Sequence, residues 1–203
     1  MQLLKSEQQN SESSPPLLDT RMRIFLFGVS NVGKTTTGKL LADKLGIAFY
    51  NLDDEVKRRL GTTLEEFVHT ANLRWRDQKR GRIIKEILQS GEKDFVFAVT
   101  PISFTHNFRN RIISENILSI ELYDTPENIF SRLVFSDEND NIYRDDAYKN
   151  KRKEHYLNEI RDDLKYYGKI FTELGVENRV FINNEPPDKV VDRIISEYHL
   201  MDR

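Results

Sequence analysis

Residues 28–35, with the sequence GVSNVGKT, constrain this chain more than any other stretch, because they match the pattern G-x-x-x-x-G-K-[ST]. The apolar run 24–27 leads into them, and a helical pattern with Leu40, Leu41 and Leu45 follows. The backbone N–H groups of such a loop and the start of the next helix favour a bound polyphosphate. We therefore predict a phosphate-binding loop. A glycine-rich turn that matches by chance is the alternative.

The fixed positions of this motif each have a chemical role. Glycines at positions 28 and 33 let the main chain approach a ligand closely, and Lys34 reaches the β- and γ-phosphates of a nucleotide. The hydroxyl of Thr35 can supply one oxygen ligand to a magnesium ion that keeps most of its waters. ATP and Mg²⁺ are the predicted cofactors, Lys34 is a predicted catalytic residue and Thr35 the metal ligand. The nucleotide-binding residues predicted in the loop are Gly28, Ser30, Asn31, Val32, Gly33, Lys34, Thr35 and Thr36.

Length and composition fit one soluble domain. The chain has 203 residues and is 38% hydrophobic, which is enough for one substantial core, and we assign residues 21–203 to a single domain. Basic residues number 31 and acidic residues 33, so no global field favours nucleic acid or a membrane surface. There is no cysteine, which excludes disulfides and thiolate chemistry. Residues 1–20 are polar and predict a flexible tail, and we expect a cytoplasmic protein that is a monomer or a weak dimer.

Short apolar runs alternate with longer helical patterns after the tail. This alternation predicts an α/β fold of three layers, with a five-stranded, mostly parallel sheet between helices. The loops that follow such strands lie along one edge of the sheet, where ligands bind. The polar run 136–146 has too few apolar residues to pack, and it predicts a mobile loop that acts as a lid. The expected strands are residues 24–27, 47–50, 95–99, 118–122 and 180–182.

Two further stretches carry candidate site residues. Asp53 and Asp54 follow the second expected strand, where a carboxylate can bind substrate hydroxyls or accept a proton, although acids here can also serve only to begin a helix. The run 74–82 contains five basic residues in nine. Arg76 and Arg80 lie four residues apart on one helical face and can aim together at an anion. A solvated helix face is the alternative for this run.

The order of these motifs resembles the shikimate kinase family. GVSNVGKTT, then GIAFYNLD at 46–53, then GTTLEEF at 61–67 look like the beginning of these enzymes, and the similarity runs from about residue 23 to 198. The resemblance implies a P-loop kinase of the nucleoside-monophosphate-kinase-like fold. It also implies transfer of phosphate from ATP to a small hydroxylated carboxylic acid, shikimate above all, which would become shikimate 3-phosphate.

The resemblance assigns roles to residues that match the family's motifs. Asp53 is similar to the aspartate that holds the ring hydroxyls and assists their deprotonation, and it is a predicted catalytic residue. Arg76, after the aromatic Trp75, resembles the arginine that binds the substrate carboxylate, and Arg161 resembles a second one.

The same resemblance extends to the nucleotide. Arg144, in the polar run, resembles the catalytic lid arginine that closes on the phosphates. Arg132 and Asn183, the latter in the stretch 183–187, resemble contacts on the adenine side.

Three departures from the family pattern lie on the acceptor side. Asn51 stands where the family has an aspartate near the magnesium ion, and an amide cannot supply its charge. The run 99–103, VTPIS, replaces a Gly-Gly-Gly segment, so side chains crowd the acceptor and Pro101 removes an N–H group. The acidic partner that the family places after the Phe-Arg pair is missing, and Asp77, Gln78 and Lys79 occupy its neighbourhood.

These departures leave alternatives open. The acceptor differs from shikimate, or turnover of shikimate is weaker than in a typical member. A regulatory nucleotide-binding module or pseudo-kinase is the alternative function. A GTPase is disfavoured, because the run 150–153, NKRK, lacks the aspartate that reads guanine.

Overall fold

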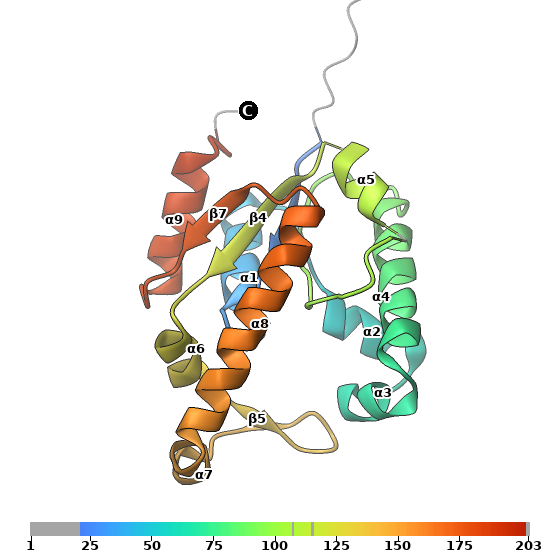
Figure 1. The fold of residues 1–203 in the computed structure, drawn as a ribbon. Coiled ribbons are helices and arrows are strands. Elements are labelled where there is room, and N and C mark those ends of the chain that lie inside the picture. The colour runs from blue at the N-terminus through green and yellow to red at the C-terminus, as the bar shows by residue number, and fades with distance from the viewer. Residues whose placement is uncertain (1–20, 107, 115, 202–203) are drawn as a thin grey trace, which may run out of the picture.

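The central sheet has five strands, all parallel, in the order β2-β3-β1-β4-β7 (Figure 1). A computed structural model describes residues 21–106, 108–114 and 116–201, and the predicted tail 1–20 lies outside these residues. Each strand lies within about two residues of a predicted apolar run, so the α/β prediction is confirmed. The strands are β1 Arg23–Phe27, β2 Ala48–Asn51, β3 Phe95–Ala98, β4 Leu118–Tyr123 and β7 Asn178–Phe181.

Helices between these strands begin and end where local chemistry favours it. Gly46 ends the first helix in the left-handed conformation, with φ 66°. The hydroxyls of Thr63 and Thr125 accept hydrogen bonds from the backbone N–H groups of Glu66 and Asn128, as expected for N-caps. The helices are α1 Lys34–Leu45, α2 Leu52–Leu60, α3 Leu64–Thr70, α4 Leu73–Leu88, α5 Arg109–Ser114, α6 Pro126–Arg132, α7 Asp146–Lys151, α8 Lys153–Glu173 and α9 Pro187–Glu197.

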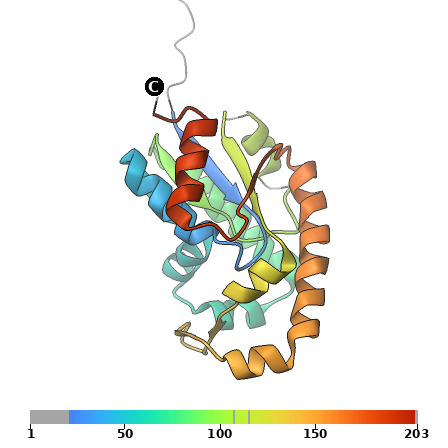
Figure 2. The same ribbon diagram turned by 90° about the vertical axis from the view of Figure 1, so that its left-hand side faces the viewer.

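Two hydrophobic layers enclose the sheet. Along β1, Phe25 and Phe27 point to the layer covered by α4 and α8, whereas Ile24 and Leu26 point to the layer covered by α1 and α9. Figures 1 and 2 show α8 and the pair α1 and α9 on opposite sides of the sheet. Because both faces of the central strands are covered, residues 24–27 of β1 and 95–98 of β3 are continuous apolar runs rather than alternating ones. This packing fixes the carboxyl ends of β1, β2 and β3 along one edge.

A short hairpin occupies the predicted polar loop. Strands β5 Phe135–Ser136 and β6 Ile142–Tyr143 pair antiparallel, and the hairpin lies between α7 and α3 (Figure 1). The carboxylate of Asp137 accepts hydrogen bonds from the N–H groups of Asn139 and Asn141, which stabilises the turn. Asp140 then reaches α3, where its carboxylate oxygens accept from the Leu64 N–H at 3.1 and 2.9 Å. These hydrogen bonds connect the hairpin to the N-terminus of α3.

Within the described ranges, no helix combines the length and apolar character needed to cross a membrane.

Candidate active site

The phosphate-binding loop follows β1 at the carboxyl edge of the sheet. Gly28 has φ 139°, and a Cβ atom there would lie 2.4 Å from the carbonyl oxygen of Leu122 on β4. Only glycine fits this close approach. Gly33, with φ 112°, is the last residue before α1, so the loop passes directly into the helix N-terminus. This is the arrangement that favours a bound phosphate.

Lys34 turns its ammonium group back onto the loop. Nζ donates hydrogen bonds to the carbonyl oxygens of Gly28 at 2.9 Å and Val29 at 2.8 Å. Burial lowers the pKa of Lys34 to about 8, and the nearby carboxylate of Asp53 opposes this shift. The cation is thus held at the loop, close enough to Asp53 for the two charges to interact.

Asn51 links the loop to the second strand. Its Nδ2 donates to the Thr35 hydroxyl at 2.8 Å. Its Oδ1 accepts from the N–H groups of Asp53 and Asp54 at 2.9 and 3.2 Å, which makes Asn51 the N-cap of α2. Because Oδ1 is committed to the cap, the amide presents N–H to Thr35, whereas an aspartate here would present a second oxygen.

A cleft of about 600 Å³ joins these residues to the acceptor side. It brings together Lys34, Thr35 and Asp53, and the Asp140 end of the hairpin closes one side of it. Thr100, on the segment expected to crowd the acceptor, also lines it. Lys57, which the sequence argument did not select, adds a cation to this cleft. The remaining lining residues are Ser30, Asn31, Asn51, Asp54, Leu64, Ala98, Pro101, Val134, Phe135, Ser136 and Ile142.

A second cavity of about 330 Å³ lies on the other side of the loop. Of the predicted adenine-side contacts, Arg132 lines it, but Asn183 does not, and the neighbouring Asn184 takes that place. The apolar side chain of Ile182 and the ring of Pro186 give this cavity surfaces that suit a planar base. The other lining residues are Val32, Gly33, Thr36, Thr37, Glu185, Pro187 and Val190.

Asp124, which the sequence argument missed, organises the second cavity. Its fully buried carboxylate pairs with Arg132 at 2.7 Å, accepts from the Asn184 N–H at 3.3 Å and accepts from the Asn128 side chain at 2.7 Å. Burial opposes ionisation, but these hydrogen bonds outweigh it and lower the pKa of Asp124. Arg132 also donates to the carbonyl oxygen of Asn31 at 3.3 Å, so the loop is tied to β4. The sequence signal that could have identified Asp124 is its position as an acid directly after the buried strand β4.

Three predicted arginines do not line either cavity. Arg76 donates to the carbonyl oxygen of Val68. Arg161, on α8, contacts Asn158 at 2.9 Å and Glu127 of α6 at 3.5 Å. Arg144 is exposed directly after β6, and it makes no hydrogen bond or ion pair with any residue that the structure describes.

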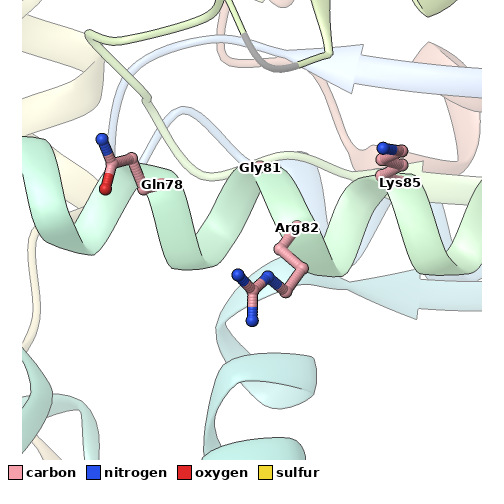
Figure 3. A pocket seen from close by; sticks show the side chains of 4 residues that line it. All are labelled: Gln78, Gly81, Arg82 and Lys85. Carbon is pink, nitrogen blue, oxygen red and sulfur yellow. The ribbon is translucent and has the colours of Figure 1, made fainter.

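The basic run 74–82 divides between two environments. Arg80 is turned inward, 3.3 Å from Asp77 and with its guanidinium 5.2 Å from the centre of the Phe67 ring. The expectation that Arg76 and Arg80 aim together at an anion is therefore wrong, because Arg80 is buried against its own partners. Arg82 lies instead beside a separate hollow of about 320 Å³ on α4 (Figure 3).

Comparison with known proteins was consistent with this site. The family model described as shikimate kinase matches residues 30–199. The shikimate kinase of Persephonella marina is 30% identical over 174 residues, which is 85% of this chain and 96% of that protein. The pentafunctional AROM polypeptide of Schizosaccharomyces japonicus is 32% identical over 94 residues, which is 45% of this chain but 6% of that longer protein. The bifunctional shikimate kinase/3-dehydroquinate synthase of Thermotoga maritima is matched over 22% of its length.

Solved structures show the same fold. A shikimate kinase from Bacteroides thetaiotaomicron superposes with a TM-score of 0.69 and 21% identity, over 88% of this chain and 98% of that one. A shikimate kinase from Acinetobacter baumannii, in complex with shikimate, gives a TM-score of 0.68 and 22% identity, over 89% and 94% of the two chains. The family match over most of the chain decides the relationship: this chain belongs to the shikimate kinase family.

Proposed function

We propose that this protein transfers the γ-phosphoryl group of ATP to a hydroxyl group of shikimate. One observation carries the proposal: Lys34, Thr35 and Asp53 face a single cleft of about 600 Å³ in a chain of the shikimate kinase family. Phosphoryl transfer asks a protein mainly for positioning and for stabilisation of charge, and these residues supply both.

ATP would lie across the phosphate-binding loop. The second cavity would take the adenine, with Arg132 at its edge, and the loop N–H groups would hold the phosphates. Lys34 would exchange its hydrogen bonds to the Gly28 and Val29 carbonyl oxygens for phosphate oxygens. The γ-phosphate would then point into the acceptor cleft.

Asp53 would act on the acceptor hydroxyl. Its carboxylate can accept a hydrogen bond from the hydroxyl and then take the proton. The hydroxyl oxygen forms its bond to the γ-phosphorus, the bond from that phosphorus to the bridging oxygen breaks, and ADP leaves. Lys34 would stabilise the charge that develops on the transferred group.

The residues present fit a magnesium ion that is held mostly by the nucleotide. Thr35 offers one hydroxyl oxygen, and Asp53 and Asp54 place negative charge in the same cleft. Across the described residues, no group of three histidine, aspartate or glutamate side chains forms a separate metal site. When bound, the ion would neutralise charge on the phosphates.

The substrate carboxylate requires a cation in the cleft. Arg76 and Arg161 remain our candidates by family resemblance, and each would have to leave its present partner to reach the substrate. Arg144 would approach the phosphates when the hairpin closes over them. Lys57 already lines the cleft, paired with Asp54 at 3.1 Å. We further propose a cytoplasmic protein that acts as a monomer or weak dimer.

Coupled measurement of ADP release, with and without shikimate, tests the proposal. Lys34→Ala should lower shikimate-dependent turnover by at least about a hundredfold while the fold stays intact, because a charge at the phosphates is lost rather than packing. Asp53→Asn should reduce turnover and spare ATP binding. Lys39→Ala, which removes an exposed lysine on the same helix, is the matched control. ATP binding without any shikimate-dependent ADP release would favour the nucleotide-binding module instead.

A further inference from the structure

The segment that follows β3 forms the acceptor-side wall without any glycine. We call residues 99–104 the acceptor wall. Thr100 and Pro101 line the cleft, while Val99 and Ile102 on either side of them are 2% and 3% exposed. The wall therefore has a buried underside and a face toward the substrate. Its position must come from contacts that hold it from below.

Asp77 of α4 makes two of these contacts. Its side chain is fully buried, and Oδ2 accepts hydrogen bonds from the N–H groups of Ser103 at 2.8 Å and Phe104 at 3.1 Å. These are consecutive backbone donors at the end of the acceptor wall. A buried carboxylate is costly unless it is hydrogen-bonded and paired, so this geometry holds the wall against α4.

Arg80 completes the arrangement from the same helix. Its Nη1 lies 3.3 Å from Asp77 Oδ1, and its guanidinium packs 5.2 Å from the centre of the Phe67 ring. The side chain of Arg80 is 9% exposed. Since Oδ1 pairs with arginine, Oδ2 is left to the two wall N–H groups, and the carboxylate has one defined orientation.

We infer that Asp77 is a positioning residue that sets the acceptor wall relative to Asp53 and thereby selects the acceptor. The inference rests on the proposed phosphorylation of shikimate. Asp77 does not line the cleft; it acts through the backbone of Ser103 and Phe104 on Thr100 and Pro101. Asp77 also follows Arg76 directly on α4, so the anchor of the wall and the candidate carboxylate-binding arginine belong to one helix.

A matched pair of double variants isolates the anchor. Asp77→Ala/Arg80→Met removes the hydrogen bonds to the wall without leaving a buried, unpaired arginine. Asp77→Asn/Arg80→Met also removes the ion pair, but its amide oxygen can still accept from both wall N–H groups. A displaced wall can cost about a hundredfold in rate for a shift of about 1 Å. We expect KM for shikimate to rise at least about tenfold in the alanine variant and to be largely rescued in the asparagine variant.

Three further readouts separate positioning from a general loss of stability. KM for ATP should stay within about twofold in both double variants, because the hydrogen bonds of Asp77 go to Arg80, Ser103 and Phe104 and not to the phosphate-binding loop. Amide hydrogen exchange of the peptide that contains Ser103 and Phe104 should accelerate only in the alanine variant. Glu121→Ala removes another buried carboxylate, paired with Arg179 at 2.7 Å on β7, and should lower the Tm without changing KM for shikimate.

Equal KM values for shikimate in the two double variants, or unchanged exchange at Ser103 and Phe104 in the alanine variant, would overturn the inference. A native protein that releases no ADP with shikimate would instead overturn the proposed substrate. In that case the exchange comparison still decides whether Asp77 holds the wall, because it needs no acceptor.

Discussion

Asn51 shows how one residue can satisfy the fold while changing the chemistry of the site. As the N-cap of α2 it accepts from two backbone N–H groups, a role that aspartate fills equally well. Toward the loop, however, it donates to Thr35 rather than accepting from it. The cap of α2 therefore does not explain why residue 51 is an amide, and we expect the effect of this amide on a bound metal ion and on the phosphates.

Asn51→Asp should strengthen magnesium binding to the nucleotide complex. The carboxylate keeps the cap, accepts a hydrogen bond from the Thr35 hydroxyl and adds a negative charge near the ion, for which we expect about a tenfold gain in affinity. Titration of Mg²⁺ into the protein with ADP, followed by calorimetry, measures this without turnover. Asp43→Asn, an exposed change on α1, is the control. Unchanged magnesium affinity would place the ion away from residue 51.

The sequence revealed site residues that belong to a local motif and missed those defined by distant contacts. Lys34 and Thr35 could be selected because they belong to one motif of eight residues, and both line the cleft. Asp77 was missed because its carboxylate accepts from backbone N–H groups 26 and 27 residues away in the chain. Asp124 stands directly after a buried strand, which was a usable signal, but one of its partners, the Asn184 N–H group, lies 60 residues away. The sequence also did not predict the direction of individual side chains, because Arg80 is buried against Asp77 and Phe67 rather than facing an anion.

At the scale of elements, burial decided what could be predicted. The central strands β1 and β3 are covered on both faces, so each is an apolar run that the sequence displays, whereas β4 alternates apolar residues with Ser119 and Glu121. The β5–β6 hairpin has two-residue strands, and hydrogen bonds to Asp137 hold its turn, so it has no hydrophobic pattern to read. The turn of this hairpin is held by its own side chain Asp137, whereas its position depends on the contact of Asp140 with Leu64.

The contact between Asp140 and Leu64 makes the hairpin's position testable. Asp140→Ala removes the acceptor of the Leu64 N–H group. The docked position of the hairpin should lose about 1 kcal/mol of stability, so the fraction of molecules with an undocked hairpin should rise about fivefold. Limited proteolysis within 136–146 should be faster, and shikimate with nucleotide should slow it less than in the native protein. Glu138→Ala removes an exposed carboxylate of the same hairpin, and this variant should be cleaved at the native rate. Equal cleavage of both variants would show that this contact does not hold the hairpin.

At the scale of the whole molecule, the parallel sheet brings two cavities to opposite sides of one loop. The acceptor cleft is lined by Ser30, Asn31, Lys34 and Thr35 of this loop and the start of α1. The second cavity is lined by Val32, Gly33 and Thr36. Nucleotide and acceptor would therefore share the loop. Binding at the loop should stabilise the entire fold, because ligands that bind only the native state raise its unfolding free energy.

This coupling should depend on the charge of Lys34. In the free protein its pKa is lowered from 10.5 to about 8, so the folded state holds fewer protons than the unfolded state between these values. The free protein therefore gains stability from this group as the pH rises through that window. Nucleotide phosphates favour the charged lysine, so above about pH 8 binding must take up a proton and affinity should fall by up to about tenfold per pH unit.

The increase in Tm caused by ADP should accordingly shrink as the pH rises from about 7 to about 9, even while the free protein gains stability from this group. Phosphate ionisation does not account for the change, because these groups are already ionised above about pH 7. Lys34→Met keeps a side chain of similar length without the charge, and should show a small ADP increment at both pH values. Thermal unfolding with and without ADP measures all four increments. An increment in the native protein that stays constant across this range, or that falls equally in Lys34→Met, would show that another group governs nucleotide binding.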